Sequence, residues 1–134
     1  MLVETDVLLA VIKVDDSLRK YGVKAFEQAN LVLSPFALIE LNFLRRAKKL
    51  VIDNYPGFSL ALTELLASHE VRLLADKPEY HLQASLLERQ FHLTFFDSLH
   101  AGVSKIEGET LLSFDRSYDK LEGAGVKRID PRSI

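Results

Sequence analysis

The sequence predicts an α/β fold with a mostly parallel central sheet. Short apolar segments alternate along the chain with longer segments whose apolar residues recur at helical spacing. Strands separated by helical segments of this kind form βαβ units, and these units build parallel sheets. The chain of 134 residues contains no repeat, linker or low-complexity tract, so we expect a single domain over residues 1–134.

Five short apolar segments are the candidate strands. The first combines apolar residues with Glu4, Thr5 and Asp6, and we interpret it as a buried strand that ends in acidic residues. The candidate strands are residues 2–9, 31–33, 71–74, 110–114 and 126–129.

Capping residues and prolines mark the expected helix starts between these strands. Two segments resemble capping boxes, Asp76 with Glu79 and Thr94 with Asp97. The other starts are Asp16-Ser17, Ser34-Pro35 for a helix that runs to about Leu50, and Ser59 after the break at Pro56-Gly57.

Composition excludes several classes of function. The chain is 48% hydrophobic and 27% charged, which is typical of a soluble globular protein. It has no cysteine, so disulfides, thiolate zinc sites and a cysteine nucleophile are excluded. Its net charge of −2 gives no overall attraction to nucleic acid, and no apolar run reaches the ~20 residues of a membrane span. The first residues lack a basic signal-peptide region, so we expect a cytoplasmic protein without membrane contact.

Glu40 is the most informative acidic residue. On a helix its neighbours three, four and seven positions away are all apolar, so it lies on the face that packs inward. They are Phe36, Ala37, Phe43, Leu44 and Ala47. A carboxylate buried there needs a cation or donor, which an arginine or backbone N–H groups would also provide.

Other acids fall at strand ends or helix starts. Glu4 and Asp6 share one face if they lie on a strand, and Asp97 and Asp115 also suit helix caps. Asp119 is closer to solvent by pattern. In a parallel sheet these positions meet at one rim, which Glu40 can reach. Grouped carboxylates repel one another and favour a hard divalent cation, Mg²⁺ or Mn²⁺, whose chemistry with water and phosphate points to phosphodiester cleavage.

The ordered motifs resemble those of PIN-domain ribonucleases of the toxin type, found in VapBC toxin–antitoxin pairs. The resemblance spans nearly the whole chain and rests on four segments in order. They are Glu4-Thr5-Asp6-Val7-Leu8-Leu9, Ser34-Pro35 with Glu40-Leu41, Phe96-Asp97-Ser98-Leu99-His100-Ala101, and Leu112-Ser113-Phe114-Asp115-Arg116-Ser117-Tyr118.

The resemblance implies a three-layer α/β/α sandwich and Mg²⁺- or Mn²⁺-dependent cleavage of single-stranded RNA, leaving 5′-phosphate and 3′-hydroxyl ends. It also implies a homodimer that a small cognate antitoxin inhibits. The catalytic acids implied are Asp6, Glu40, Asp97 and Asp115, all metal ligands together with Glu4. Ser113 matches a supporting hydroxyl residue.

The chain departs from the family pattern at two places. The opening motif of the family usually reads Asp-Thr-Asn, whereas this chain has Glu4-Thr5-Asp6, so either acid can be the first metal ligand. Ser117 stands where relatives often carry another acid, and Asp119 is the residue that would compensate.

Basic residues are candidates for the substrate phosphates. Setting the charge of the five candidate ligands aside changes the net charge from −2 to +3. Arg116, beside Asp115, and Arg45 and Arg46 on the Glu40 helix are the candidates, although cations at a helix end also complement its dipole. We expect His100 to be a packed helix residue.

Three further alternatives stay open. The opening Glu4-Thr5-Asp6 is similar to the Asp-x-Asp start of haloacid-dehalogenase-like phosphatases, but their nucleophile position holds Glu here. The substitution at Glu4 also suits a PIN-like domain that binds RNA or a partner without cutting. Finally, the leucines of the segment 60–66 belong to the core or to a dimer interface.

Overall fold

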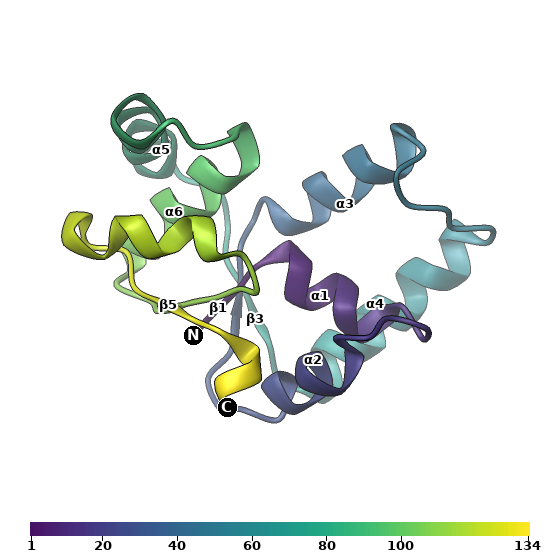
Figure 1. Ribbon diagram of the computed structural model, residues 1–134. Helices are drawn as coiled ribbons and strands as arrows, with labels where there is room; N and C mark the ends of the chain where they lie inside the picture. Colours follow the sequence, from purple (N-terminus) through teal and green to yellow (C-terminus); the bar gives the residue numbers. More distant parts are fainter.

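The centre of the structure, a computed structural model of residues 1–134, is a five-stranded sheet whose neighbouring strands are all parallel. The strand order is β3-β2-β1-β4-β5, so the first strand of the chain lies in the middle (Figure 1). The strands are β1 Leu2–Val3, β2 Val32–Leu33, β3 Arg72–Leu73, β4 Leu111–Leu112 and β5 Arg128–Ile129. The predicted α/β fold with a parallel sheet is confirmed.

Helices cover both faces of this sheet (Figure 1). One layer holds α1 Thr5–Ile12, α2 Arg19–Phe26, α3 Ala37–Arg46 and α4 Tyr55–Ser68. The other holds α5 Pro78–Phe91, α6 Phe95–Glu107 and the 3₁₀ helix η1 Arg116–Ala124. A last 3₁₀ turn, η2 Pro131–Ser133, follows β5.

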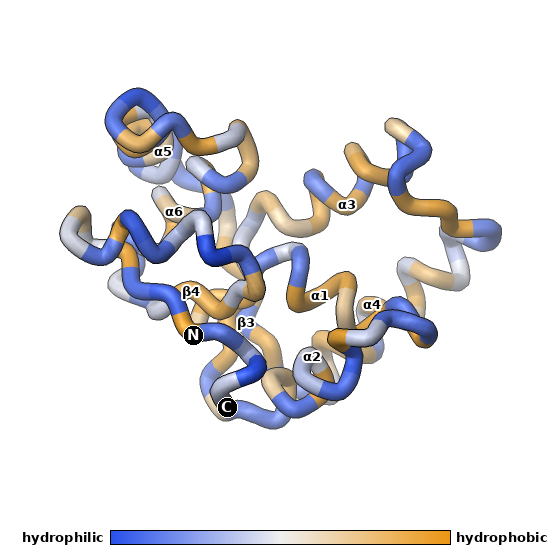
Figure 2. Tube along the Cα trace, in the orientation of Figure 1, coloured by the Kyte–Doolittle hydropathy of each residue, from blue (hydrophilic) through white to orange (hydrophobic).

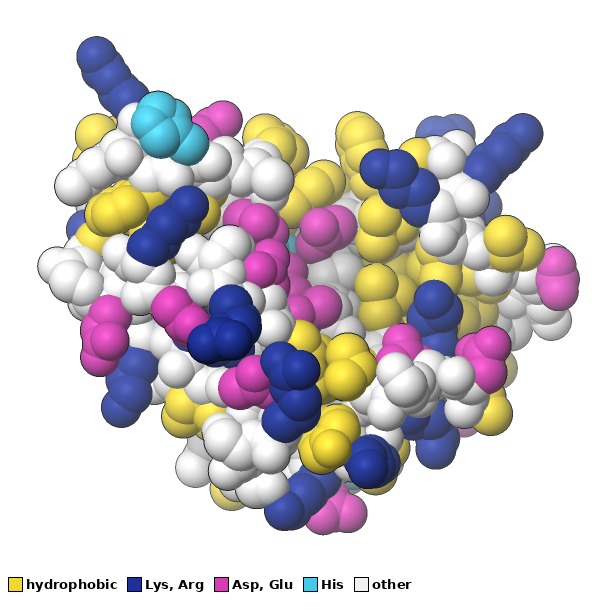
Figure 3. All heavy atoms as spheres, viewed as in Figure 1, with side chains coloured by type: hydrophobic (Ala, Val, Ile, Leu, Met, Phe, Trp, Pro, Cys, Tyr) yellow, Lys and Arg dark blue, Asp and Glu magenta, His cyan; other side chains and the backbone are white.

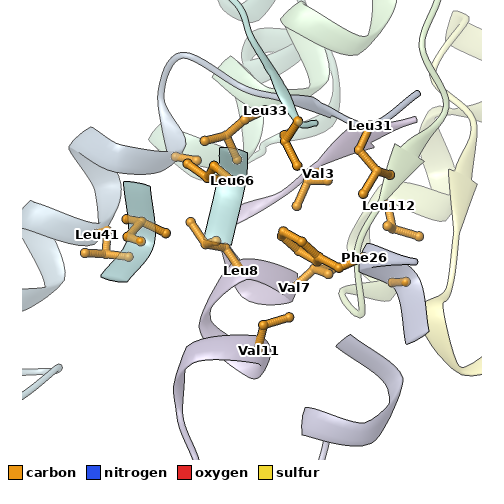
Figure 4. Packing of buried hydrophobic residues seen from close by; sticks show 14 of the residues in the cluster. Val3, Val7, Leu8, Val11, Phe26, Leu31, Leu33, Leu41, Leu66 and Leu112 are labelled. Carbon is orange, nitrogen blue, oxygen red and sulfur yellow. The ribbon is translucent and has the colours of Figure 1, made fainter. Parts of the chain in front are cut away.

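Successive side chains of the central strands point to opposite faces of the sheet and divide the core into two clusters. The first residue of each of the three central strands packs with α5 and α6. The second packs with α1 to α4 (Figure 4). The first residues are Leu2, Val32 and Leu111, and the second are Val3, Leu33 and Leu112. Because both faces are covered, the three central strands are apolar on both sides. Hydrophilic segments gather in the outer turns (Figure 2).

The prediction for the first strand is wrong in length, because β1 ends at Val3 and α1 follows at once. Glu4 is the N-cap of α1, and its carboxylate accepts the backbone N–H of Asp6 at 2.8 Å. Val7 and Val11 then lie on the buried face of the helix. A continuous apolar run fits a buried helix as well as a buried strand, so periodicity alone did not separate them. Glu4 and Asp6 therefore lie at a helix start and not on one strand face.

Two other helices start at residues that differ from the predicted ones, because side chains form hydrogen bonds in the turns at their starts. The helix expected from Ser34 begins at Ala37, since the preceding turn is closed by Ser34 Oγ, which accepts the backbone N–H of Phe36. Pro56-Gly57 lies inside the first turn of α4, because the side chain of Asn54 accepts the N–H of Gly57.

The two expected capping boxes are not formed. Thr94 is the N-cap of α6, as predicted, but its side chain makes no capping hydrogen bond. Lys77 is the N-cap of α5, and Asp76 instead contacts Nε2 of His81 at 2.9 Å.

The helices differ in length and in how far their apolar residues are buried. No helix of the protein is both long and apolar enough to cross a membrane. In α4, Leu62 and Leu66 are buried and Leu65 packs against the same cluster, so these residues belong to the core. Leu60 is exposed.

Candidate functional site

Acidic side chains gather in a hollow between the two halves of the molecule (Figure 3). They come from separate parts of the chain: the β1–α1 junction, α3, the first turn of α6 and the segment after β4. Parallel strands place their carboxyl ends at one edge of a sheet, and the helices that follow begin there. The acids in question are Glu4, Asp6, Glu40, Asp97 and Asp115.

Glu4 is buried at the floor of this group, with 4% of its surface exposed. Its Oε2 accepts the N–H of Asp6, and its Oε1 lies 3.4 Å from Nε2 of His100. Burial is the main reason that the pKa of Glu4 is raised well above its usual value, and the nearby charges of Asp6 and Glu40 raise it further. A carboxylate in this environment resists ionisation unless a cation is added.

Asp6 presents one free oxygen. Its Oδ2 accepts two hydrogen bonds at 2.8 Å, from Ser113 Oγ and from the backbone N–H of Phe114. Its Oδ1 is buried and has no hydrogen-bond partner. Ser113 Oγ also accepts the N–H of Asp115 at 3.0 Å, so it connects the first-strand motif with the segment after β4.

Glu40 and His100 form a polar contact between α3 and α6, which also meet through the rings of Phe43 and Phe96. Glu40 is mostly buried, as its pattern predicts, and its Oε1 lies 2.9 Å from Nε2 of His100. His100 is fully buried, with Nδ1 2.8 Å from Ser34 Oγ and Nε2 3.2 Å from Thr5 Oγ1. Ligand atoms of Glu4, Glu40 and His100 all lie within 4.8 Å of one another.

Asp97 and Asp115 form the outer part of the group. Asp97 is half-buried and accepts a hydrogen bond from the Tyr118 hydroxyl at 3.2 Å. Burial raises the pKa of Asp97, and the charge of Asp115 adds to this shift. The pKa of the Tyr118 hydroxyl is also raised well above its usual value, first by burial and then by the charges of Glu4, Asp97 and Asp6. Tyr118 thus contacts or faces three acids, which come from the β1–α1 junction and from α6.

Asp115 keeps the capping role that its position suggested. It is the N-cap of η1, and its Oδ1 accepts the backbone N–H of Ser117 at 2.8 Å. Unlike the other four acids, Asp115 is exposed.

The remaining candidate residues lie apart from this group. Asp119 is bound by Arg128, with Nε to Oδ1 at 2.6 Å, which lowers the pKa of Asp119. Arg116 is 83% exposed and its only ion pair is with Asp119 at 3.9 Å. The guanidinium of Arg45 lies 4.0 Å from the centre of a tyrosine ring in α4, and Arg46 is exposed without an ion pair.

A divalent cation fits the chemistry of these residues. No lysine or arginine forms an ion pair with any of the five acids, although four of them are wholly or partly buried. Buried charge without a counter-charge is costly. The Oδ1 of Asp6, which has no hydrogen-bond partner, is an oxygen that can coordinate a divalent cation.

Sequence reasoning missed the central positions of His100 and Tyr118. A signal for His100 was present, because it lies three residues after Asp97 and therefore one turn further along the same helix face. Tyr118 had no comparable signal, since η1 is a 3₁₀ helix and its orientation depends on how it packs.

Comparisons with known proteins agree with this architecture. A family model described as PIN domain matches residues 1–124. VapBC2 from Rickettsia felis, solved bound to a DNA fragment from its promoter, is similar with a TM-score of 0.70, 11% identity and coverage of 96% of both chains. PAE2754 from Pyrobaculum aerophilum is similar with a TM-score of 0.63 and 25% identity, over 98% of this chain and 90% of that one. No curated protein matches the sequence.

Proposed function

Because this chain belongs to the PIN-domain family, whose members are generally nucleases, we propose that it is a divalent-metal-dependent endoribonuclease that cleaves single-stranded RNA. One observation carries the proposal: acids from four separate segments converge in one hollow without a lysine or arginine partner, and one of their buried oxygens is unpaired.

The five acids would hold Mg²⁺ or Mn²⁺. They are Glu4, Asp6, Glu40, Asp97 and Asp115. When bound, such an ion activates water and neutralises charge on a phosphodiester. The unpaired Oδ1 of Asp6 favours Asp6 as a direct ligand of the ion. Glu4 would contribute Oε1, the oxygen that faces His100.

The protein's own residues would prepare the site before substrate binds. Ser113 and the N–H of Phe114 fix Asp6, and the Tyr118 hydroxyl fixes one oxygen of Asp97. Burial raises the pKa of Asp97, so a bound cation would favour its ionised form. Arg116 is exposed and next to Asp115 in the chain, so it is the proposed contact for substrate phosphate.

We propose catalytic roles for the acids and weaker substrate roles for Arg45 and Arg46. Arg45 packs on Tyr55 and donates to Asn42, which leaves less of its guanidinium for RNA. Asp119 would act only through Arg128, which also donates to the backbone carbonyl of Ser113.

The biological role that we propose is the toxin of a toxin–antitoxin pair, acting in the cytoplasm with a small cognate antitoxin. The similarity to the VapBC2 complex supports this role. We also propose a homodimer, for which the exposed apolar side chains of Ile39 and Phe43 on α3 offer surface.

A second candidate function is RNA or partner binding without cleavage. The observation that favours it is Glu4, whose longer side chain caps α1 and turns toward His100. In that case the site would bind a cation yet leave RNA intact.

The test is incubation of the purified protein with single-stranded RNA and DNA, with Mg²⁺, Mn²⁺ or EDTA. We expect cleavage of RNA only in the presence of metal, and its loss by at least about 100-fold in Asp97→Asn. Cleavage that persists in Asp97→Asn would reject the assigned site. Mn²⁺ binding without any cleavage of varied RNAs would favour the second candidate.

A further inference from the structure

The imidazole of His100 is the only fully buried basic side chain in contact with the acids. We propose that His100 is a positioning residue, which donates a hydrogen bond from Nε2 to Glu40 and is not itself a metal ligand. The inference rests on the proposed function, because it concerns the same metal site.

Glu40 depends on this contact for its orientation. Its carboxylate has one hydrogen-bond partner in the protein, Nε2 of His100 at 2.9 Å. Glu40 emerges from α3, whereas His100 is fixed in α6, so the bond joins elements on opposite faces of the sheet. Without it, the side chain of Glu40 would be free to turn toward solvent.

The surroundings of the ring determine which nitrogen carries the proton. Two carboxylate oxygens face Nε2, from Glu40 at 2.9 Å and from Glu4 at 3.4 Å. An ionised carboxylate only accepts hydrogen bonds, so Glu40, which has the closest oxygen, favours a proton on Nε2, and the hydroxyl of Thr5 at 3.2 Å can accept from the same nitrogen. A protonated Nε2 has no electron pair to offer a metal ion.

Ser34 supports the same assignment from the other side of the ring. Its Oγ accepts the backbone N–H of Phe36 at 3.3 Å, and its own hydrogen can be donated to Nδ1 of His100 at 2.8 Å. Ser34 is 1% exposed, so water does not compete for that hydrogen. Outer partners of this kind orient metal ligands, and their loss typically weakens metal binding 10–100-fold.

The experiment compares two substitutions that retain different halves of the imidazole. The amide nitrogen of His100→Gln reaches the position of Nε2, whereas that of His100→Asn reaches only the position of Nδ1. Mn²⁺ affinity of the full chain is measured by calorimetry without RNA. We expect His100→Asn to weaken binding on the order of 10–100-fold and His100→Gln by less than about 5-fold. Loss of a nitrogen ligand would weaken both variants equally, which would overturn the proposal.

Electron spin-echo spectroscopy of bound Mn²⁺ gives a direct readout. We expect no coupling to a directly bound imidazole nitrogen in the wild-type protein, and its detection would overturn the proposal. Ser34→Ala keeps the imidazole and tests the case in which both His100 variants fail to fold. We expect it to weaken Mn²⁺ binding several-fold, and unchanged affinity would argue against us.

The experiments can refute the proposed nuclease function without refuting the role proposed for His100. Wild-type protein that binds Mn²⁺ but cuts no RNA would refute the nuclease while leaving the His100 comparison decisive. Wild-type protein that binds no Mn²⁺ would overturn both.

Discussion

Substitution of Glu4 by Gln should stabilise the metal-free protein at neutral and higher pH. Glu4 is 4% exposed, and its ligand atom lies within 4.8 Å of that of Glu40. Two negative charges at that separation repel by about 3.5 kcal/mol at an effective dielectric constant near 20. The Gln amide oxygen can still accept the N–H of Asp6, so we expect a gain of about 1–3 kcal/mol in the free energy of unfolding.

The pH dependence of this gain has a defined sign. Folding raises the pKa of Glu4, mainly through burial, so the folded state favours the protonated form. The associated stability is fully present below the unfolded pKa of about 4.3 and is lost as pH rises through the folded value. Glu4→Gln and wild type should therefore be similar near pH 4 and diverge toward pH 8.

Thermal denaturation in EDTA at several pH values measures the effect. The expected gain corresponds to a Tm increase of roughly 4–12 °C at pH 8. Glu64→Gln, at an exposed position in α4 without an ion pair, is the matched control and should change the Tm little. With Mn²⁺ the wild-type protein should have a higher Tm than Glu4→Gln, because the bound ion stabilises the folded wild type more. A Glu4→Gln protein less stable than wild type at pH 8 in EDTA would refute the reasoning.

Three further substitutions test the surrounding structure. Gly102→Ala would place a Cβ 2.6 Å from the carbonyl oxygen of Tyr80, so urea denaturation should show a loss of about 1–3 kcal/mol from displaced α5 and α6. Arg128→Met should lower the Tm, as it leaves Asp119 and Asp130 without their shared partner. Folding lowers the pKa of Asp130 to about 2, so ionised Asp130 stabilises the folded protein above its unfolded pKa, and this stabilisation is lost as pH falls toward 2. In that range the free energy of unfolding of Asp130→Asn should depend less on pH than that of the wild type.

Much of the acid group could be predicted from the chain because backbone topology places it. Asp97 and Asp115 were located at a helix start and a strand end, and parallel strands bring such positions to one edge. Glu40 was identified by its apolar neighbours on a helix, and its side chain is mostly buried as expected. These inferences needed only the period of the pattern and the direction of the strands.

The β1–α1 junction shows where pattern reasoning failed. Residues 2–9 are apolar except for Glu4, Thr5 and Asp6, and so short an apolar segment fits a buried strand as well as a buried helix. The change of conformation at Glu4 depends on its capping bond to Asp6 and on packing of Val7 and Val11 against the sheet. As a result the two acids differ in environment, and only Asp6 keeps an unpaired oxygen.

The sequence by itself determined the α/β class with its parallel sheet and supplied the candidate acidic residues, because these follow from local periodicity and residue type. Only the tertiary structure decided which side chains share the hollow and which atoms face each other. His100 illustrates the difference: its contacts with Ser34 and Glu40 join residues 66 and 60 positions apart. Contacts of that range depend on how helices pack across a sheet, which no local spacing specifies.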